Sequence, residues 1–164
     1  MPPQKILLFE DESLLAHDLK QQIQQFNYEV VAIFRKAEDG LRFLESIEQP
    51  ENLPDIVLMD ISLAGKMSGI EAAQIIAEKY HFALVFLTGI SQLDLYEDAF
   101  KTKPHAFLIK PFDIQQALVS IRLAVYQNSL ETRVLKNQEE FEEKIKERIR
   151  EFQLSNEQSG KEIN

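Results

Sequence analysis

DIVLMDISLAGKMSGIEAAQIIAEKYHFALVFLTG, residues 55–89, is the stretch that decides the fold of this chain. It begins and ends with short, almost continuously apolar runs, residues 55–59 and 83–87, as expected for strands that are buried on both faces. The segment between them carries apolar residues at helical spacing, among them Ile70, Ala73 and Ala77. A strand, a helix and a second strand in this order predict a right-handed crossover between two parallel strands.

The same alternation extends in both directions along the chain. Further apolar runs predict strands at residues 5–9 (KILLF), 29–33 (EVVAI) and 105–109 (HAFLI). The segment after the last strand has an apolar face with helical spacing, made of Ile114, Ala117, Leu118, Ile121 and Val125. Strand and helix alternating five times predict a doubly wound α/β domain with a five-stranded parallel sheet, over residues 4–128.

Composition excludes several classes of protein. The chain has 164 residues, of which 45% are hydrophobic, so wholesale disorder is not expected. It has no cysteine, which excludes disulfides, thiolate metal sites and a cysteine nucleophile. Its formal net charge of -9 disfavours direct binding to nucleic acid, and no apolar run is long enough to predict a membrane span. We expect a cytoplasmic protein.

Chemically capable side chains follow four of the predicted strands. Glu10 and Asp11 come after the first, Asp60 after the third, Thr88 after the fourth and Lys110 after the fifth. Ligands of doubly wound sheets bind at the carboxyl ends of the strands. Clustered carboxylates repel one another, so this set makes sense around a divalent cation, and hard oxygen ligands favour Mg²⁺. Asp60 would then be a nucleophile toward phosphorus, Lys110 would supply positive charge and Thr88 a hydrogen bond.

The acidic pair after the first strand, the MDISL segment, the LTG after the fourth strand and FLIKPF in the fifth resemble response-regulator receiver domains, in order and in spacing, over residues 4–128. The resemblance implies a flavodoxin-like sheet with strand order 2-1-3-4-5. It also implies that Asp60 is a phosphoacceptor, phosphorylated by a histidine kinase or phosphotransfer protein, and that the domain is a signalling switch rather than an enzyme. The implied output surface is the face of the fourth and fifth strands and the last helix.

The same resemblance assigns individual roles. It implies that Mg²⁺ is held by Glu10, Asp11, Asp60 and the main-chain carbonyl of Ser62. Thr88 would be the switch hydroxyl and Phe107 the aromatic switch residue. The peptide bond between Lys110 and Pro111 would be cis, a form that only proline makes at low cost.

Three features depart from the commonest family pattern. Glu10 stands where aspartate is more frequent, the loop SLAGKMSGIE after Asp60 lacks a proline and is one residue longer, and Ile90 and Ser62 flank the face from which water would attack. Because Ile90 cannot orient water, we expect a long-lived acyl phosphate. Two alternative functions are a magnesium phosphohydrolase, disfavoured because Ser62 stands where such enzymes place a second acid, and a receiver-like scaffold that is never phosphorylated.

Residues 129–164 differ in kind, since they contain no proline and are dominated by Glu, Lys and Arg. They predict a charged helical extension or linker, helical to about residue 156, with an apolar stripe of Val134, Phe141, Ile145, Ile149 and Phe152. The stripe needs a surface, and a second copy of the chain would give a homodimer through the last receiver helix and this tail. The alternatives are a solvated tail and a connection to a further domain of a longer protein.

Overall fold

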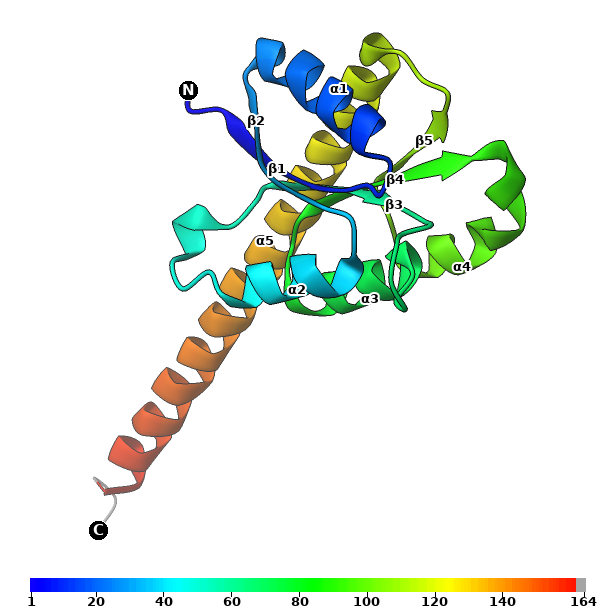
Figure 1. The fold of residues 1–164 in the computed structure, drawn as a ribbon. Helices are drawn as coiled ribbons and strands as arrows, with labels where there is room; N and C mark the ends of the chain where they lie inside the picture. Colours follow the sequence, from blue (N-terminus) through cyan, green and yellow to red (C-terminus); the bar gives the residue numbers. More distant parts are fainter. Residues whose placement is uncertain (162–164) are drawn as a thin grey trace. The chain divides into compact units, whose positions relative to one another are not determined.

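The computed structural model describes residues 1–161, apart from the side chain of Leu93. Its centre is a five-stranded parallel sheet with strand order β2-β1-β3-β4-β5, which confirms the predicted fold (Figure 1). The observed strands begin and end within two residues of the predicted apolar runs. They are β1 (Gln4–Phe9), β2 (Tyr28–Phe34), β3 (Ile56–Asp60), β4 (Ala83–Gly89) and β5 (Ala106–Lys110).

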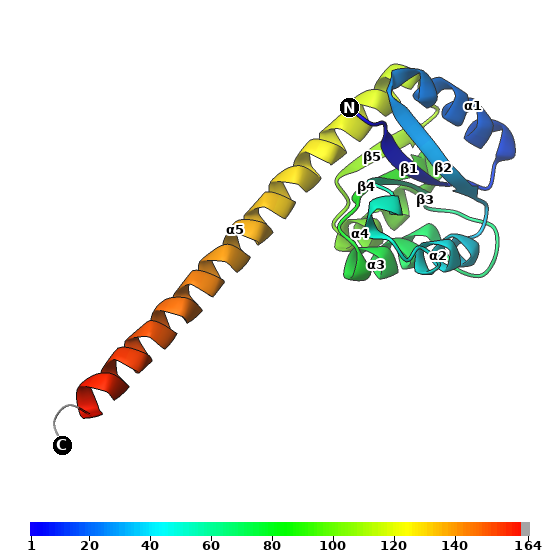
Figure 2. The same cartoon turned by 90° about the vertical axis from the view of Figure 1, so that its left-hand side faces the viewer.

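Helices cover both faces of the sheet, as Figure 2 shows for α1 on one side and α2, α3 and α4 on the other. Apolar side chains of α1 and of the first part of α5 pack on one face of the strands, and those of α2, α3 and α4 pack on the opposite face. The helices are α1 (Ser13–Ile23), α2 (Ala37–Glu45), α3 (Gly69–Lys79), α4 (Tyr96–Lys101) and α5 (Ile114–Lys161), and the short 3₁₀ helices are η1 (Gln24–Phe26), η2 (Pro50–Asn52) and η3 (Ile90–Leu95).

The start of α3 is fixed by local interactions. The Ser68 hydroxyl accepts from the main-chain N–H of Glu71, and the Glu71 carboxylate accepts from that of Ser68, which is a capping box. Gly69 follows, with its own N–H donated to the carbonyl of Ile61. The buried face of α3 includes Ala72, Ala73 and Ile76, and Ile70 is partly buried against the same core, so of the predicted stripe only Ala77 is wrong, since it is exposed.

The chain divides into two compact units, Met1–Asn128 and the residues from Ser129 onward, and α5 contains residues of both. The second unit is helical as far as Lys161, which confirms the predicted helix and extends it past residue 156. Every residue from 129 to 161 is exposed, including the five apolar residues of the predicted stripe. Among the described helices, none is both long and apolar enough to cross a membrane.

Candidate phosphoacceptor site at the carboxyl edge of the sheet

The predicted site residues lie at one edge of the sheet because parallel strands end on the same side. Asp60 is the last residue of β3, Lys110 is the last residue of β5, and Thr88 is the next-to-last residue of β4. Glu10 directly follows β1, and its main-chain N–H is held by the carbonyl of Phe34 at 3.0 Å. Glu10, Asp60 and Thr88 are all buried, which is unusual for polar groups at the end of a strand.

Lys110 joins two of the carboxylates. Its Nζ lies 2.7 Å from Oδ2 of Asp60 and 2.8 Å from Oε2 of Glu10. Burial of the ammonium acts to lower the pKa of Lys110, but the hydrogen bonds to Asp60 and Glu10 outweigh it and raise that pKa above its usual value. Lys110 therefore stays charged and is held against the candidate acceptor. The peptide bond that follows it, to Pro111, is cis, as predicted.

Glu10 is the most deeply buried acid of the site. Burial raises the pKa of its carboxyl to about 7, against the opposing effects of the hydrogen bonds from Lys110 and from the main-chain N–H of Glu12. The nearby Asp60 carboxylate acts in the same direction as burial. A carboxyl held in this way favours a cation beside it, because a positive charge would offset the cost of burying the ionised form.

The carboxylates of Glu10, Asp11 and Asp60 form an acidic cluster that could hold a metal ion. One oxygen from each lies within 4.8 Å of the other two. When all three are ionised, the single ammonium of Lys110 leaves two negative charges uncompensated, which equals the charge of one divalent cation. An all-oxygen donor set of this kind suits Mg²⁺. The residues therefore fit the predicted metal.

The loop from β3 to α3 is fastened close to Asp60. The main-chain N–H of Ser62 donates to Oδ1 of Asp60 at 2.9 Å. Farther along, a parallel bridge pairs Ala64 with Lys36. Gly65 has a φ of 91°, a left-handed conformation that glycine adopts without strain. The loop thus turns at Gly65 and is attached to the segment after β2.

Glu38 at the start of α2 supports this loop and was not among the predicted site residues. Its Oε1 accepts from the main-chain N–H groups of Lys66 at 3.1 Å and Met67 at 3.0 Å. Hydrogen bonds from main-chain N–H groups, its own first and then those of Met67 and Lys66, hold the pKa of the Glu38 carboxyl below its usual value.

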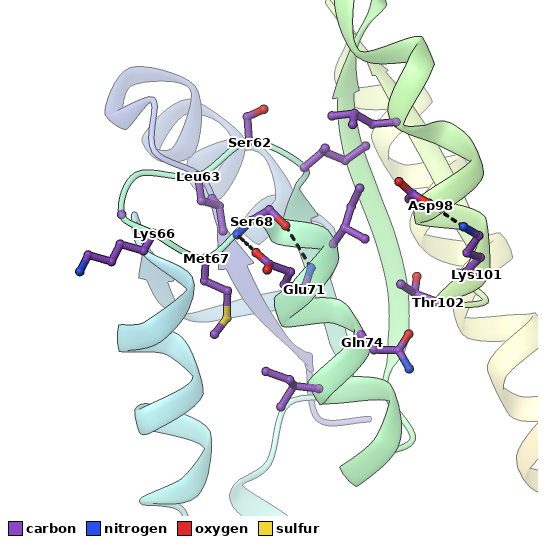
Figure 3. Close-up of a pocket in the computed structure, with 15 residues that line it drawn as sticks. Ser62, Leu63, Lys66, Met67, Ser68, Glu71, Gln74, Asp98, Lys101 and Thr102 are labelled. Atoms are coloured by element: carbon purple, nitrogen blue, oxygen red, sulfur yellow. Dashed lines mark hydrogen bonds and ion pairs between the residues drawn. The ribbon is translucent and has the colours of Figure 1, made fainter.

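A separate cavity of about 830 Å³ lies between the β3–α3 loop, α3 and α4, with Ser62, Met67, Glu71 and Lys101 among its lining residues (Figure 3). The acidic cluster does not line this cavity, nor do Thr88 and Lys110. The cavity therefore adjoins the predicted phosphoacceptor site at Ser62 but does not contain its carboxylates.

Thr88 is fully buried, and its hydroxyl lies near two acceptors. Its Oγ1 is 3.3 Å from the carbonyl oxygen of Gly89 and 3.4 Å from Oε1 of Gln92. Gln92 lies in η3 and was not among the predicted site residues. The only signal for it in the sequence is a polar residue one turn after the LTG motif, which is too common to single out.

Phe107 lies in an aromatic group between β4 and α4. Its ring centroid is 5.7 Å from that of Phe86, 4.7 Å from that of Tyr96 and 4.9 Å from that of Phe100. The side chain is half-buried and contacts rings of both β4 and α4. Ile90, the residue expected to exclude water, is 67% exposed.

Comparison with known proteins agrees with this geometry. The sequence profile of the response regulator receiver domain matches residues 6–122. The chemotaxis protein CheY of Listeria monocytogenes is 30% identical over 121 residues, which are 73% of this chain and 97% of CheY. The transcriptional regulatory protein PdtaR of Mycobacterium tuberculosis is 38% identical over 123 residues, or 75% of this chain. The match covers only 57% of PdtaR, a little over half its length.

Solved structures give the same picture. The signal receiver domain of a modulated diguanylate cyclase from Desulfovibrio desulfuricans superposes with a TM-score of 0.70 at 29% identity, over 79% of this chain and 98% of that one. A response regulator receiver domain protein from Clostridium thermocellum superposes with a TM-score of 0.68 at 28% identity, over 77% of this chain and 98% of that one.

Proposed function

Since this chain belongs to the family of response regulator receiver domains, which serve two-component signalling, we propose that Asp60 is its phosphoacceptor and that phosphorylation switches its output surface. The observation that carries the proposal is the position of Lys110, whose Nζ contacts Asp60 and Glu10 together beside the acidic cluster. A scaffold that is never phosphorylated has no need to bury this set of charges.

The proposed reaction is an attack of an Asp60 carboxylate oxygen on the phosphorus of a donor. A new P–O bond forms to Asp60, and the bond from phosphorus to the donor breaks, with its electron pair leaving on the donor. Lys110 lies where it can neutralise negative charge on the phosphoryl oxygens, and the Thr88 hydroxyl can donate to one of them. Positioning and charge neutralisation are the main requirements of such a transfer.

We propose that Glu10, Asp11, Asp60 and the main-chain carbonyl of Ser62 hold Mg²⁺. When bound, the cation supplies further positive charge for the phosphoryl oxygens. The chain's own residues prepare for it. The Ser62 N–H holds one oxygen of Asp60, and Lys110 holds the other and a carboxylate oxygen of Glu10, which leaves the cluster with a net negative charge.

The donor would be a histidine kinase or a phosphotransfer protein. Movement of Thr88 toward the phosphoryl group would allow Phe107 to shift against Tyr96 and Phe100. A partner or a following domain would read the change on the face of β4, β5 and the first part of α5. Self-association through α5 and the extension would carry the signal further. We expect the protein to act in the cytoplasm, without contacting nucleic acid itself.

The test is phosphorylation from a small acyl-phosphate donor with Mg²⁺, followed by intact-mass measurement of wild type and Asp60→Asn. We expect wild type to gain one phosphoryl group and the variant none. Asp98→Asn, which removes an exposed carboxylate paired with Lys101, is the matched control and should label like wild type. Equal labelling of wild type and Asp60→Asn would falsify the assignment.

A further inference from the structure

Gln92 connects two segments that flank the candidate acceptor. Its Nε2 donates to the hydroxyl of Ser62, and its Oε1 accepts from the main-chain N–H of Gly89 at 2.9 Å. Because a main-chain N–H can only donate, the atom that faces Gly89 must be the carboxamide oxygen, and this fixes the orientation of the amide. The same oxygen lies 3.4 Å from Oγ1 of Thr88.

These contacts complete a hydrogen-bonded path from the acceptor to the predicted switch residue. The main-chain N–H of Ser62 holds Oδ1 of Asp60, the Ser62 hydroxyl accepts from Gln92, and Gln92 accepts from Gly89 and Thr88. The β3–α3 loop and the end of β4 are thus joined by one side chain. Among residues 1–161, Gln92 alone hydrogen-bonds to the side chains of both Ser62 and Thr88.

The Thr88 hydroxyl has a single proton to donate. In this structure the acceptors within reach are neutral, the carbonyl of Gly89 and the carboxamide of Gln92. A phosphoryl oxygen on Asp60 would be a charged and therefore stronger acceptor. To donate to it, Thr88 must turn its proton away from both neutral acceptors, so Gln92 and the Gly89 carbonyl each compete with the phosphoryl oxygen.

We propose that Gln92 is a positioning residue that holds the Thr88 hydroxyl in its unphosphorylated arrangement and so opposes phosphorylation of Asp60. The inference rests on the proposed function, because it requires a phosphoryl group at Asp60. It assigns Gln92 a role in setting how readily the switch responds, separate from the residues that carry out the transfer.

The first test measures labelling rates. Gln92→Met keeps the length of the side chain and removes both polar atoms, and should label roughly two- to fivefold faster than wild type, the effect of losing one neutral hydrogen bond. In a Thr88→Val background the same substitution should change nothing, because no hydroxyl is left to release. Gln74→Met removes an exposed carboxamide of α3 that donates to Glu78, and should label like wild type.

The second test needs no phosphoryl group. In unphosphorylated Gln92→Met, the main-chain N–H of Gly89 loses its acceptor, so its hydrogen exchange, followed by NMR, should be faster than in wild type. Unchanged exchange, an unchanged labelling rate, or an equal acceleration in the Thr88→Val background overturns the role of Gln92. If wild type is not phosphorylated but hydrogen exchange at Gly89 responds as expected, the proposed function is wrong and the hydrogen bond from Gly89 to Gln92 is correct. The regulatory role of Gln92 is then wrong as well, because it depends on phosphorylation.

Discussion

The two units of the chain treat charged and apolar groups in opposite ways. At the carboxyl edge of the sheet, Glu10 and Asp60 are buried and paired with Lys110. In the extension, Phe141 and Ile149 are more than half exposed although they are apolar. Buried charge and exposed apolar surface both cost free energy, so the stability of the fold explains neither feature.

The two units also differ in whether the groups of the proposed function contact one another. At the edge of the sheet the groups that would act on a phosphoryl donor already contact one another, so their chemistry can be argued from distances. In the extension the apolar stripe is exposed, and a second copy of the chain as the surface that covers it is a proposal. The first unit therefore supports a proposed mechanism, and the second a proposed association.

The largest expected difference between the two units is the response to one added methyl group in each. A Cβ on Gly69 would lie 1.8 Å from the main-chain oxygen of Asp60, whereas one on Gly160 would meet nothing within 4 Å. We expect Gly69→Ala to lower the free energy of unfolding by about 3 kcal/mol or more, because backbone must move to admit it. Gly160→Ala should slightly raise helicity, since alanine favours a helix by about 1 kcal/mol over glycine.

Urea titration and far-UV circular dichroism measure these two effects. If Gly69→Ala were as stable as wild type, the main chain at Gly69 could not lie as close to the main-chain oxygen of Asp60 as it does here.

The next effect concerns association. Ile145→Ala removes part of the extension stripe, and in a two-fold dimer it does so twice, so we expect the dissociation constant to rise by roughly tenfold or more. Leu14→Ala removes a comparable exposed side chain of α1, outside the stripe, and should have no effect. Light scattering and sedimentation, with and without phosphorylation, measure the change, beside a chain that ends at Gln127. If the full chain and the shortened one are both monomers at high concentration, the stripe does not mediate self-association.

Most of the fold could be predicted because buried parallel strands have a simple signature. Runs such as residues 55–59 and 83–87 are apolar on both faces, so their positions follow from hydropathy alone. In α3 the exposure of Ala77 did not follow, because alanines at 72, 73 and 77 allow more than one of them to face the core. The close approach of Gly69 to Asp60 is a tertiary contact that no periodicity contains.

For the site, sequence order was enough to bring Glu10, Asp60 and Lys110 to one edge, because parallel strands impose it. It was not enough to find Glu38 or Gln92. Both act through long polar side chains that cross from one loop to another, and their partners are main-chain groups or a serine hydroxyl with no sequence signature of their own.

The smallest expected effect separates the three acids of the cluster. Lys110 forms ion pairs with Glu10 and Asp60, whereas Asp11 forms none within residues 1–161. Removing Asp11 therefore takes away repulsion without breaking a contact, and we expect Asp11→Ala to raise the free energy of unfolding of the metal-free protein by about 0.5–1 kcal/mol. Glu157→Ala, in the exposed extension, removes the same charge and should leave that value unchanged.

Added Mg²⁺ should make wild type more stable than Asp11→Ala, the reverse of their order without the metal. A ligand that binds only the folded state stabilises it in proportion to its affinity, by about 2.7 kcal/mol at a hundred times the dissociation constant. Wild type should therefore gain stability with added Mg²⁺, and Asp11→Ala should gain much less, because it lacks one of the three clustered carboxylates. Thermal or urea unfolding at a series of Mg²⁺ concentrations measures how the free energy of unfolding of each protein rises with Mg²⁺. Equal gains in the two proteins would mean that the cation binds elsewhere, and that Asp11 belongs with the solvated charges of the extension rather than with the buried pair beside Lys110.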